Sequence, residues 1–280
     1  MTVVTVVTVV TGMTTPYPEV NEFLGDLLQG ARAALGERLV AFYLYGSLAL
    51  GDFMPQRSDV DFLAVTEGDL PSDVLHRLQE MHRRLAASGS PWAHRVEGSY
   101  YPREALRRYD ASNATHPKME APEAFPTMKR HRTNTVIHRY MVREHGVVLF
   151  GPDPRILIDP VTPDDLRHAL LELMPTWWAP MLTDPTRLEY SGYQTYAVLT
   201  MCRVLYTMER GEVVSKPVAA RWALSQPELA RRWSGLIERA LAWSGPSQEA
   251  EVEETQALID FTLQRSESLA KQKISSRPEQ

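Results

Sequence analysis

The sequence has little cysteine, little net charge and no long hydrophobic run, and each lack excludes a class of protein. Cys202 is the only cysteine in 280 residues, so the chain cannot form an internal disulfide. A single thiol suits a reducing compartment, which predicts a cytoplasmic protein. No apolar run is long enough to cross a bilayer, which argues against a membrane span. With 30 basic and 35 acidic residues, the net charge of −5 argues against non-specific binding to nucleic acid or membranes.

What is present suits a globular chain of one large or two ordinary domains. Hydrophobic residues make up 44% of it, enough for a sizeable core. Residues 1–17 begin with a Thr-Val-Val repeat and are expected to form a disordered or irregular extension. The run Gly151-Pro152-Asp153-Pro154 is the best candidate for a domain boundary. The sequence therefore predicts a first domain over 18–151 and a second over 152–280.

The first domain alternates between helical and strand patterns. Apolar residues at helical spacing predict a helix over 18–35, and short apolar runs predict buried strands over 39–45 and 58–65. Further elements are expected as a helix over 71–89, a strand over 94–101, a helix around 136–141 and a strand over 147–150. This order favours an α/β (α+β) unit with a small, mixed sheet. The stretch between Pro102 and Pro126 holds four prolines and no sustained period, which predicts a long loop.

The second domain reads as helices throughout. Apolar stripes and helix-opening prolines predict an all-α bundle with short links. Five of the six tryptophans lie in this half, and we interpret them as packing residues rather than a sugar platform. Cys202 is flanked by apolar residues and is predicted to be a buried structural thiol.

The candidate ligand-binding residues of the first domain are concentrated between Tyr45 and Phe62. A Gly46-Ser47 turn follows the first strand, and glycine lets the backbone approach a ligand closely. Asp59 and Asp61 alternate along the next strand and therefore point to the same side. Two carboxylates there make a poor core but suit Mg²⁺, which accepts oxygen ligands and keeps phosphate oxygens in its shell. The stretch predicts a site for a triphosphate with metal ions.

This stretch resembles the DNA polymerase β nucleotidyltransferase superfamily, in which a strand is followed by Gly-Ser and then by Asp-x-Asp. Here eleven residues separate Ser47 from Asp59. That resemblance implies a third carboxylate on a neighbouring strand, and Glu97 fits. A general base must come within hydrogen-bond reach of the attacking hydroxyl. The alternative for Glu97 is an edge strand with its side chain in water. Glu104, beyond Pro102, is the second candidate for the base.

Three further stretches narrow the resemblance. Residues 145–152 with 159–161, residues 197–211 and residues 216–223 are similar to the aminoglycoside 3''- and 9-adenylyltransferases, and the similarity spans roughly 20–270. It implies a nucleotidyltransferase domain followed by a helical domain, with ATP as co-substrate and two Mg²⁺ ions. The resemblance implies that Glu97, Asp59 and Asp61 are catalytic and that the two aspartates also bind metal. It implies that ATP is bound by Gly46, Ser47, Ser58, Arg203 and Lys216. Without the resemblance, Lys216 reads as an ordinary exposed lysine, and Phe261 reads as core packing rather than an adenine contact.

The acceptor is less defined than the donor. Family members that modify streptomycin use a tryptophan in the loop after the base strand and acidic residues before the long helix. This chain has no tryptophan between Trp92 and Trp177. Glu189 matches one acidic position, and Tyr193 stands where the other is expected. Glu120, Glu123 and Asp184 are further acids that could line an acceptor pocket or simply face solvent.

The resemblance implies an enzyme that transfers AMP from ATP to a hydroxyl of a small cationic molecule, and we expect this enzyme to be a monomer. Aminoglycoside and aminocyclitol antibiotics of the streptomycin or spectinomycin type are the expected acceptors. Two alternatives stay open, namely transfer of AMP to a protein or another acceptor, and nucleotide binding for regulation without transfer.

Overall fold

The computed structural model describes residues 15–245 and 251–275. The chain divides into two compact units, residues 1–160 and 161–280, and each is described by itself. The predicted extension over 1–17 lies mostly outside the described residues. Within its described part, Thr15 donates and accepts hydrogen bonds with Asn21 at the start of the first helix. No helix among the described residues is long and apolar enough to span a membrane.

The first unit is built on a six-stranded mixed sheet with the order β5-β4-β3-β2-β1-β6. The strands are β1 (Leu39–Tyr45), β2 (Val60–Thr66), β3 (Val96–Pro102), β4 (Thr115–Met119), β5 (Thr127–Arg130) and β6 (Val147–Phe150). Only β2 and β3 pair in parallel, and the other neighbours are antiparallel. The mixed sheet expected from the sequence is confirmed.

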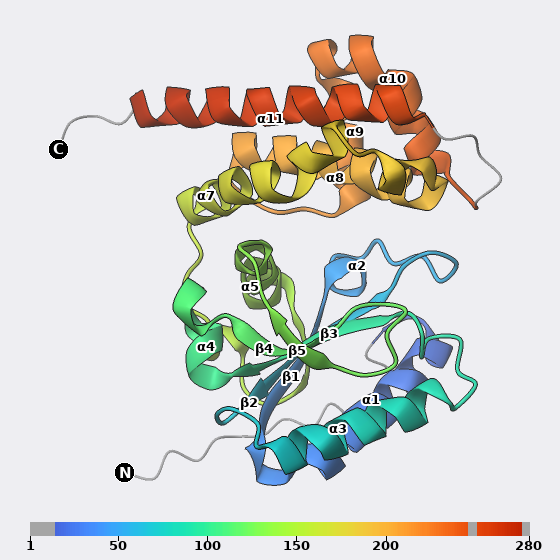
Figure 1. Ribbon diagram of the computed structural model, residues 1–280, viewed down its shortest axis with the longest axis vertical. Helices are drawn as coiled ribbons and strands as arrows, with labels where there is room; N and C mark the ends of the chain where they lie inside the picture. The colour runs from blue at the N-terminus through green and yellow to red at the C-terminus, as the bar shows by residue number, and fades with distance from the viewer. Residues whose placement is uncertain (1–14, 246–250, 276–280) are drawn as a thin grey trace. The chain divides into compact units, whose positions relative to one another are not determined.

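One face of this sheet is apolar and forms the core. Phe42, Phe62 and Tyr100 are fully buried there, and the rings of the first two stack with centroids 4.9 Å apart. Helices α1 (Pro18–Leu35) and α3 (Ser72–Ala86) cover this face (Figure 1). Burying each large side chain stabilises the fold by about 1.5–3 kcal/mol. The helices expected over 18–35 and 71–89 exist because their apolar stripes complete this core.

The other face of the same strands carries polar side chains. The register pairs Tyr45 with Asp61, Asp61 with Glu97, and Ser99 with Lys118, and paired residues share a face. Helix α5 (Asn134–His145) lies on this side (Figure 1), with His138 5.2 Å from the Tyr45 ring. The unit also contains α2 (Gly46–Ala49), α4 (Arg103–Arg107), α6 (Pro154–Leu157) and the 3₁₀ turns η1 (Gly36–Arg38) and η2 (Ala111–Asn113).

The expectation of a long loop between Pro102 and Pro126 is wrong. That stretch holds α4, η2 and β4, and β4 is enclosed between β3 and β5. The strand was hidden because Pro117 stands inside it, opposite Met128 of β5, and proline cannot donate a ladder hydrogen bond. The strands β2 and β3 also start two residues later than predicted, because Ser58 and Asp59 belong to the loop before β2, and His94 and Arg95 belong to a turn before β3.

The linker after β6 packs with the first unit. The Tyr43 hydroxyl donates to the carbonyl of Pro152 at 2.7 Å. The Asp159 amide donates to the carbonyl of Arg107 at 3.2 Å, and the two side chains form an ion pair at 3.0 Å. These contacts explain why the units divide after Pro160, later than the boundary expected near Gly151.

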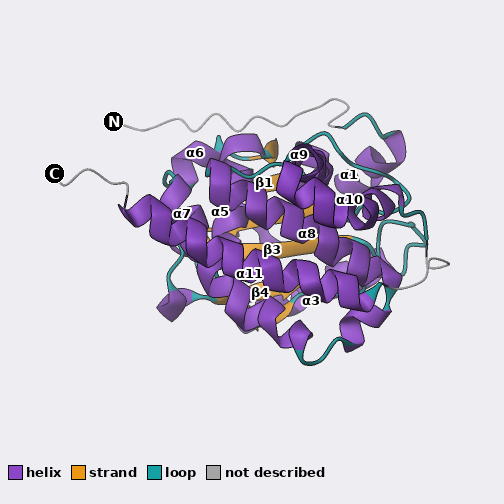
Figure 2. Ribbon diagram, turned by 90° about the horizontal axis from the view of Figure 1, so that it is seen from above, coloured by secondary structure: helices purple, strands orange, loops and turns teal. Residues whose placement is uncertain are grey.

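The second unit contains only helices among its described residues (Figure 2). They are α7 (Pro163–Leu173), α8 (Ser191–Arg210), α9 (Lys216–Ser225), α10 (Pro227–Ala242) and α11 (Val252–Ser275), with short segments η3 (Met174–Trp178), η4 (Ala179–Leu182) and η5 (Thr186–Glu189). Figure 2 shows α8 and α11 side by side. Of the five tryptophans expected to pack, Trp178 and Trp233 are buried, and Trp177, Trp222 and Trp243 are partly exposed. Cys202 is buried on α8, and burial raises its pKa to about 12.

Candidate nucleotide and metal site

The turn between β1 and α2 brings the backbone against an acidic side chain. Gly46 has a positive φ of 66°. A Cβ at this position would lie 2.0 Å from Oδ2 of Asp61, closer than atoms can approach. Glycine is therefore required both by the backbone conformation and by the neighbouring carboxylate. Ser47 follows on α2 and is partly exposed at the same edge of the sheet.

Asp61 lies on the polar side of β2, and Asp59 lies in the loop directly before this strand. Both are partly exposed, whereas Val60 and Phe62 between and beyond them are fully buried. The strand therefore begins after Asp59, one residue later than an arrangement with both aspartates on β2 requires. Ser58, just before them, accepts a hydrogen bond from the Met54 amide at 2.9 Å.

Arg95 stabilises the loop that contains Ser58 and Asp59. Its guanidinium donates to the carbonyl of Pro55 at 2.6 Å and also to the carbonyl of Ser58. Its Nε lies 3.9 Å from a carboxylate oxygen of Asp59. Sequence reasoning did not single out Arg95, although a cation two residues before Glu97 was a usable signal.

Glu97 lies on an interior strand, since β3 is paired with β2 on one side and β4 on the other. The edge-strand alternative is therefore wrong. The parallel register places Glu97 beside Asp61. Burial, followed by the negative charges of Asp59 and Glu120, raises the pKa of Glu97 to about 7 against the opposing effect of Lys118. Glu104 is exposed on α4, beyond the far end of β3.

The donor set fits a hard cation with open coordination positions. Within the described residues, no three His, Cys, Asp or Glu side chains are close enough to enclose a metal ion on their own. Mg²⁺ is usually held by one or two carboxylates together with substrate phosphates. Asp59 and Asp61 supply such a pair. The charges of Asp59 and Glu120 add to burial in raising the pKa of Glu97, so a cation bound nearby would oppose part of this shift.

The expected residues of the second unit lie on α8, α9 and η5. Arg203 is partly exposed on α8. Lys216 is the first residue of α9, with Nζ 4.2 Å from the centroid of the Tyr196 ring. Phe261 packs against Trp233 with centroids 4.7 Å apart, which agrees with a packing role.

The two acceptor candidates differ in exposure. Glu189 is exposed at the end of η5. The Tyr193 ring is partly buried on α8, 5.6 Å from the Tyr196 ring. Its hydroxyl is buried and has no hydrogen-bond partner among the residues that the structure describes.

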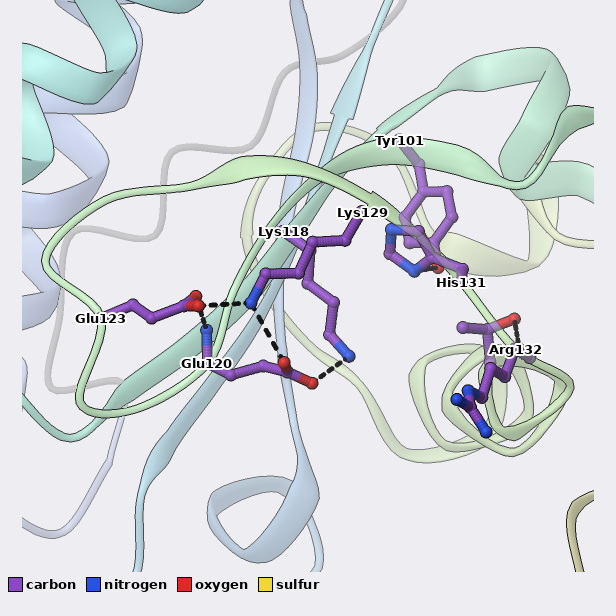
Figure 3. Close-up of polar contacts among 8 residues, drawn as sticks. Tyr101, Lys118, Glu120, Glu123, Lys129, His131 and Arg132 are labelled. Carbon is purple, nitrogen blue, oxygen red and sulfur yellow. Dashed lines mark hydrogen bonds and ion pairs between the residues drawn. The ribbon is translucent and has the colours of Figure 1, made fainter. Parts of the chain in front are cut away.

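A charged network at the β4–β5 connection was missed because that stretch was expected to be a loop. Lys118 and Lys129 bind the Glu120 carboxylate at 2.6 and 3.1 Å, and Lys129 also binds Glu123 at 2.5 Å (Figure 3). The network borders Glu97, because both Lys118 and Glu120 act on its pKa. The acids Glu120 and Glu123 are therefore already paired with lysines.

Two protein families match this chain, one in each half. The nucleotidyltransferase domain family matches residues 28–98, and the aminoglycoside adenylyltransferase C-terminal domain family matches residues 156–267. An aminoglycoside (3'') (9) adenylyltransferase from Shigella flexneri is 27% identical over 230 residues, covering 74% of this chain and 79% of that protein. A spectinomycin 9-adenylyltransferase from Staphylococcus aureus is 26% identical over 210 residues, covering 68% and 72% respectively.

A solved structure shows the same fold. Spectinomycin adenyltransferase from Enterococcus faecialis, crystallised with ATP and spectinomycin, superposes with a TM-score of 0.68. It is 19% identical to this chain, and the match covers 88% of this chain and 98% of that one. The two family matches together cover more than half of the chain, the first within residues 1–160 and the second almost entirely within residues 161–280.

Proposed function

The chain belongs to the aminoglycoside adenylyltransferase family, and from that premise we propose that it transfers AMP from ATP to a hydroxyl of an aminoglycoside or aminocyclitol antibiotic. The observation that carries the proposal is the pairing of Asp61 with Glu97 on one face of the sheet, with Asp59 close enough for its charge to raise the pKa of Glu97. Two of these carboxylates suit a metal–triphosphate, and the third has the proton affinity of a general base.

Glu97 takes the proton of the acceptor hydroxyl. A pKa near 7 lets a carboxylate accept a proton effectively at neutral pH while remaining ionised in a large share of molecules. The hydroxyl oxygen then forms a bond to the α-phosphorus of ATP, and the bond from that phosphorus to the bridging oxygen breaks. Pyrophosphate leaves with the electron pair, and AMP remains on the acceptor.

Asp59 and Asp61 would hold Mg²⁺, with two ions as the proposed number. When bound there, the metal would supply positive charge that neutralises the phosphates. Gly46 allows the triphosphate to approach the backbone of the β1–α2 turn, and Ser47 and Ser58 contact phosphate oxygens. Arg95 keeps Ser58 and Asp59 in place by binding the carbonyls of their loop.

In the second unit, Arg203 and Lys216 bind phosphate oxygens of the nucleotide and neutralise charge on the leaving pyrophosphate. Glu189 and Tyr193 contact the acceptor. The exposed Glu189 carboxylate can bind an ammonium group, and the partly exposed Tyr193 side chain can contact the body of the acceptor. Because spectinomycin is named for several relatives, we place it first among acceptors.

The function is tested by incubating the full chain with ATP, Mg²⁺ and a panel that includes spectinomycin and streptomycin. Mass spectrometry of each antibiotic should show the addition of one AMP group, accompanied by pyrophosphate. AMP appearing only on a protein would contradict the small-molecule assignment. ATP and Mg²⁺ binding without any transfer would support a regulator instead.

Replacing Gly46 with alanine should abolish nucleotide binding, because the new methyl group collides with the Asp61 carboxylate. Gly51→Ala is the matched control, since Gly51 also has a positive φ, 75°, but nothing lies within 4 Å of an added Cβ. Both variants carry a backbone cost of about 1–2 kcal/mol. ATP titration calorimetry should show binding in Gly51→Ala and none in Gly46→Ala. Equal binding by the two variants would contradict the close contact between the turn and Asp61.

A further inference from the structure

Lys216 lies at the end of α9 that least favours a positive charge. It is the first residue of the helix, and Ser215 caps the helix by accepting a hydrogen bond from the Val218 amide at 3.4 Å. The aligned peptide dipoles place partial positive charge at this end, so a lysine there is repelled by the helix dipole. A partner with negative charge density therefore helps to determine where the Lys216 ammonium group lies.

The ring of Tyr196 is such a partner. The face of an aromatic ring carries negative charge density and attracts an ammonium group within about 6 Å of its centroid. Nζ of Lys216 lies 4.2 Å from the centroid of the Tyr196 ring. Tyr196 belongs to α8 and Lys216 to α9, two helices of the second unit that pack against each other. The contact therefore joins the start of α9 to α8.

Other rings hold Tyr196 while it stays open to solvent. Its ring stacks with that of Trp178, with centroids 5.9 Å apart and planes inclined at 25°, and Trp178 is 1% exposed. The Tyr193 ring lies 5.6 Å away on the same helix. Tyr196 itself is 40% exposed. A ring that packs on a buried indole and still reaches the surface can hold a cation where a ligand has access to it.

We propose that Tyr196 is a positioning residue for Lys216 and holds its ammonium group ready to bind the triphosphate of ATP. A lysine side chain in solution samples many rotamers, and fixing it when a ligand binds costs conformational entropy. The Tyr196 ring lowers that cost, because it already restricts Nζ before ATP arrives. The inference rests on the proposed function, in which Lys216 binds phosphate, and adds the residue that prepares Lys216 for this role.

The test is a double-mutant cycle on the affinity for ATP with Mg²⁺, measured by titration calorimetry on the full chain. Lys216→Met should weaken binding about 30-fold, as for a lost hydrogen bond to a charged group, and Tyr196→Leu about fivefold. Because Tyr196 acts through Lys216, the double variant should bind ATP with the same affinity as Lys216→Met alone. Additive losses would show that Tyr196 acts on the nucleotide by itself and would overturn the proposal, as would wild-type affinity in Tyr196→Leu.

Two further variants separate the ring face from packing. Tyr196→Phe keeps the face and should bind ATP within about twofold of wild type. Replacing the Tyr196 ring with pentafluorophenylalanine keeps the shape of that phenyl ring but removes the negative charge density of its face. Affinity should then fall about fivefold below that of Tyr196→Phe. Equal affinity of the two would contradict the proposal, and this pair also serves if Tyr196→Leu does not fold.

Tyr206→Leu is the matched control for a general loosening of the helix pair. Tyr206 also lies on α8 and contacts α9, where its ring meets that of Trp222 edge to face at 5.3 Å. Removing it leaves the ring beside Lys216 in place, so ATP affinity should stay within about twofold of wild type. A loss as large as that of Tyr196→Leu would show that packing of α8 on α9 is responsible, and the positioning role would be refuted.

A spectroscopic readout separates this inference from the proposed function. The chain has five lysines, so ¹³C labelling at lysine Cε gives few NMR signals, and that of Lys216 is the one absent from Lys216→Met. A ring shields protons above its face, so the Hε signal of Lys216 should lie upfield in wild type relative to Tyr196→Leu, without ATP. An unchanged signal would overturn the proposal. If wild-type protein modified no antibiotic, the function would fail, while this shift and the ATP affinities still decided the role of Tyr196.

Discussion

Glu97→Gln is expected to lower AMP transfer about a thousandfold, within the range of 10²–10⁴ that general-base catalysis contributes. The amide has the size of the carboxylate but cannot accept the hydroxyl proton. ATP binding should change by no more than about threefold, since the change leaves Asp59 and Asp61 in place. Steady-state transfer assays and ATP titration calorimetry on the same preparation measure the two effects separately.

The same variant should be more stable than wild type at alkaline pH when Mg²⁺ is removed with EDTA. The pKa of Glu97 is about 7 in the folded protein against 4.5 for an ordinary glutamate, so the folded state holds the proton more tightly. Stability from this group is therefore lost as pH rises from about 4.5 through 7. Glutamine removes that loss, and we expect a gain of about 1–3 kcal/mol at pH 8 that shrinks towards pH 5.

Glu104→Gln is the control for this prediction. It makes the same chemical change on α4, where the carboxyl group is exposed. Its activity and its melting temperature at both pH values should match wild type. Full activity in Glu97→Gln would show that another group is the base, and activity lost only in Glu104→Gln would identify that group.

Asp59→Ala should lose the Mg²⁺-dependent part of ATP binding, a drop of about 100-fold in affinity. The variant removes one of two carboxylates that hold the cation, and one carboxylate with phosphate oxygens binds Mg²⁺ less tightly. In EDTA the difference should disappear or reverse, because wild type then has an extra negative charge facing the triphosphate. Calorimetry with and without Mg²⁺ measures both cases.

Asp26→Ala serves as the matched control, since it removes an exposed carboxylate from α1 in the same unit. Its ATP affinity should equal that of wild type with and without Mg²⁺. Unchanged binding by Asp59→Ala in the presence of Mg²⁺ would refute the assignment of the metal site.

The donor side of the site could be predicted because its parts are close in sequence. The turn at Gly46 and the two aspartates belong to neighbouring strands, and the pairing of Tyr45 with Asp61 follows from a short connection. Glu97 could be added because a charge inside an apolar strand is costly without a role. The collision that makes Gly46 necessary depends on the Asp61 rotamer, which no sequence pattern encodes.

The stretch after Pro102 could not be predicted by the same means. Strand β4 is short and contains Pro117. It is stabilised by pairing with β3 and β5, and a local sequence pattern does not show which strands will pair. Because that strand was missed, the sequence did not predict on which face of the sheet Lys118 and Lys129 lie, or which acids they bind. The helices of the second unit were easier to predict, because an apolar stripe such as that of α8 repeats at helical spacing over many consecutive residues.

The buried thiol of Cys202 can serve as a built-in chemical probe of unfolding in the second unit. A thiol reagent reacts with the thiolate, which burial disfavours here, so labelling requires α8 to open. Since the chain has no other cysteine, the labelling rate measures opening of residues 161–280 without any signal from the sheet. The unmodified sequence thus allows the stability of one half to be followed while substitutions are made in the other.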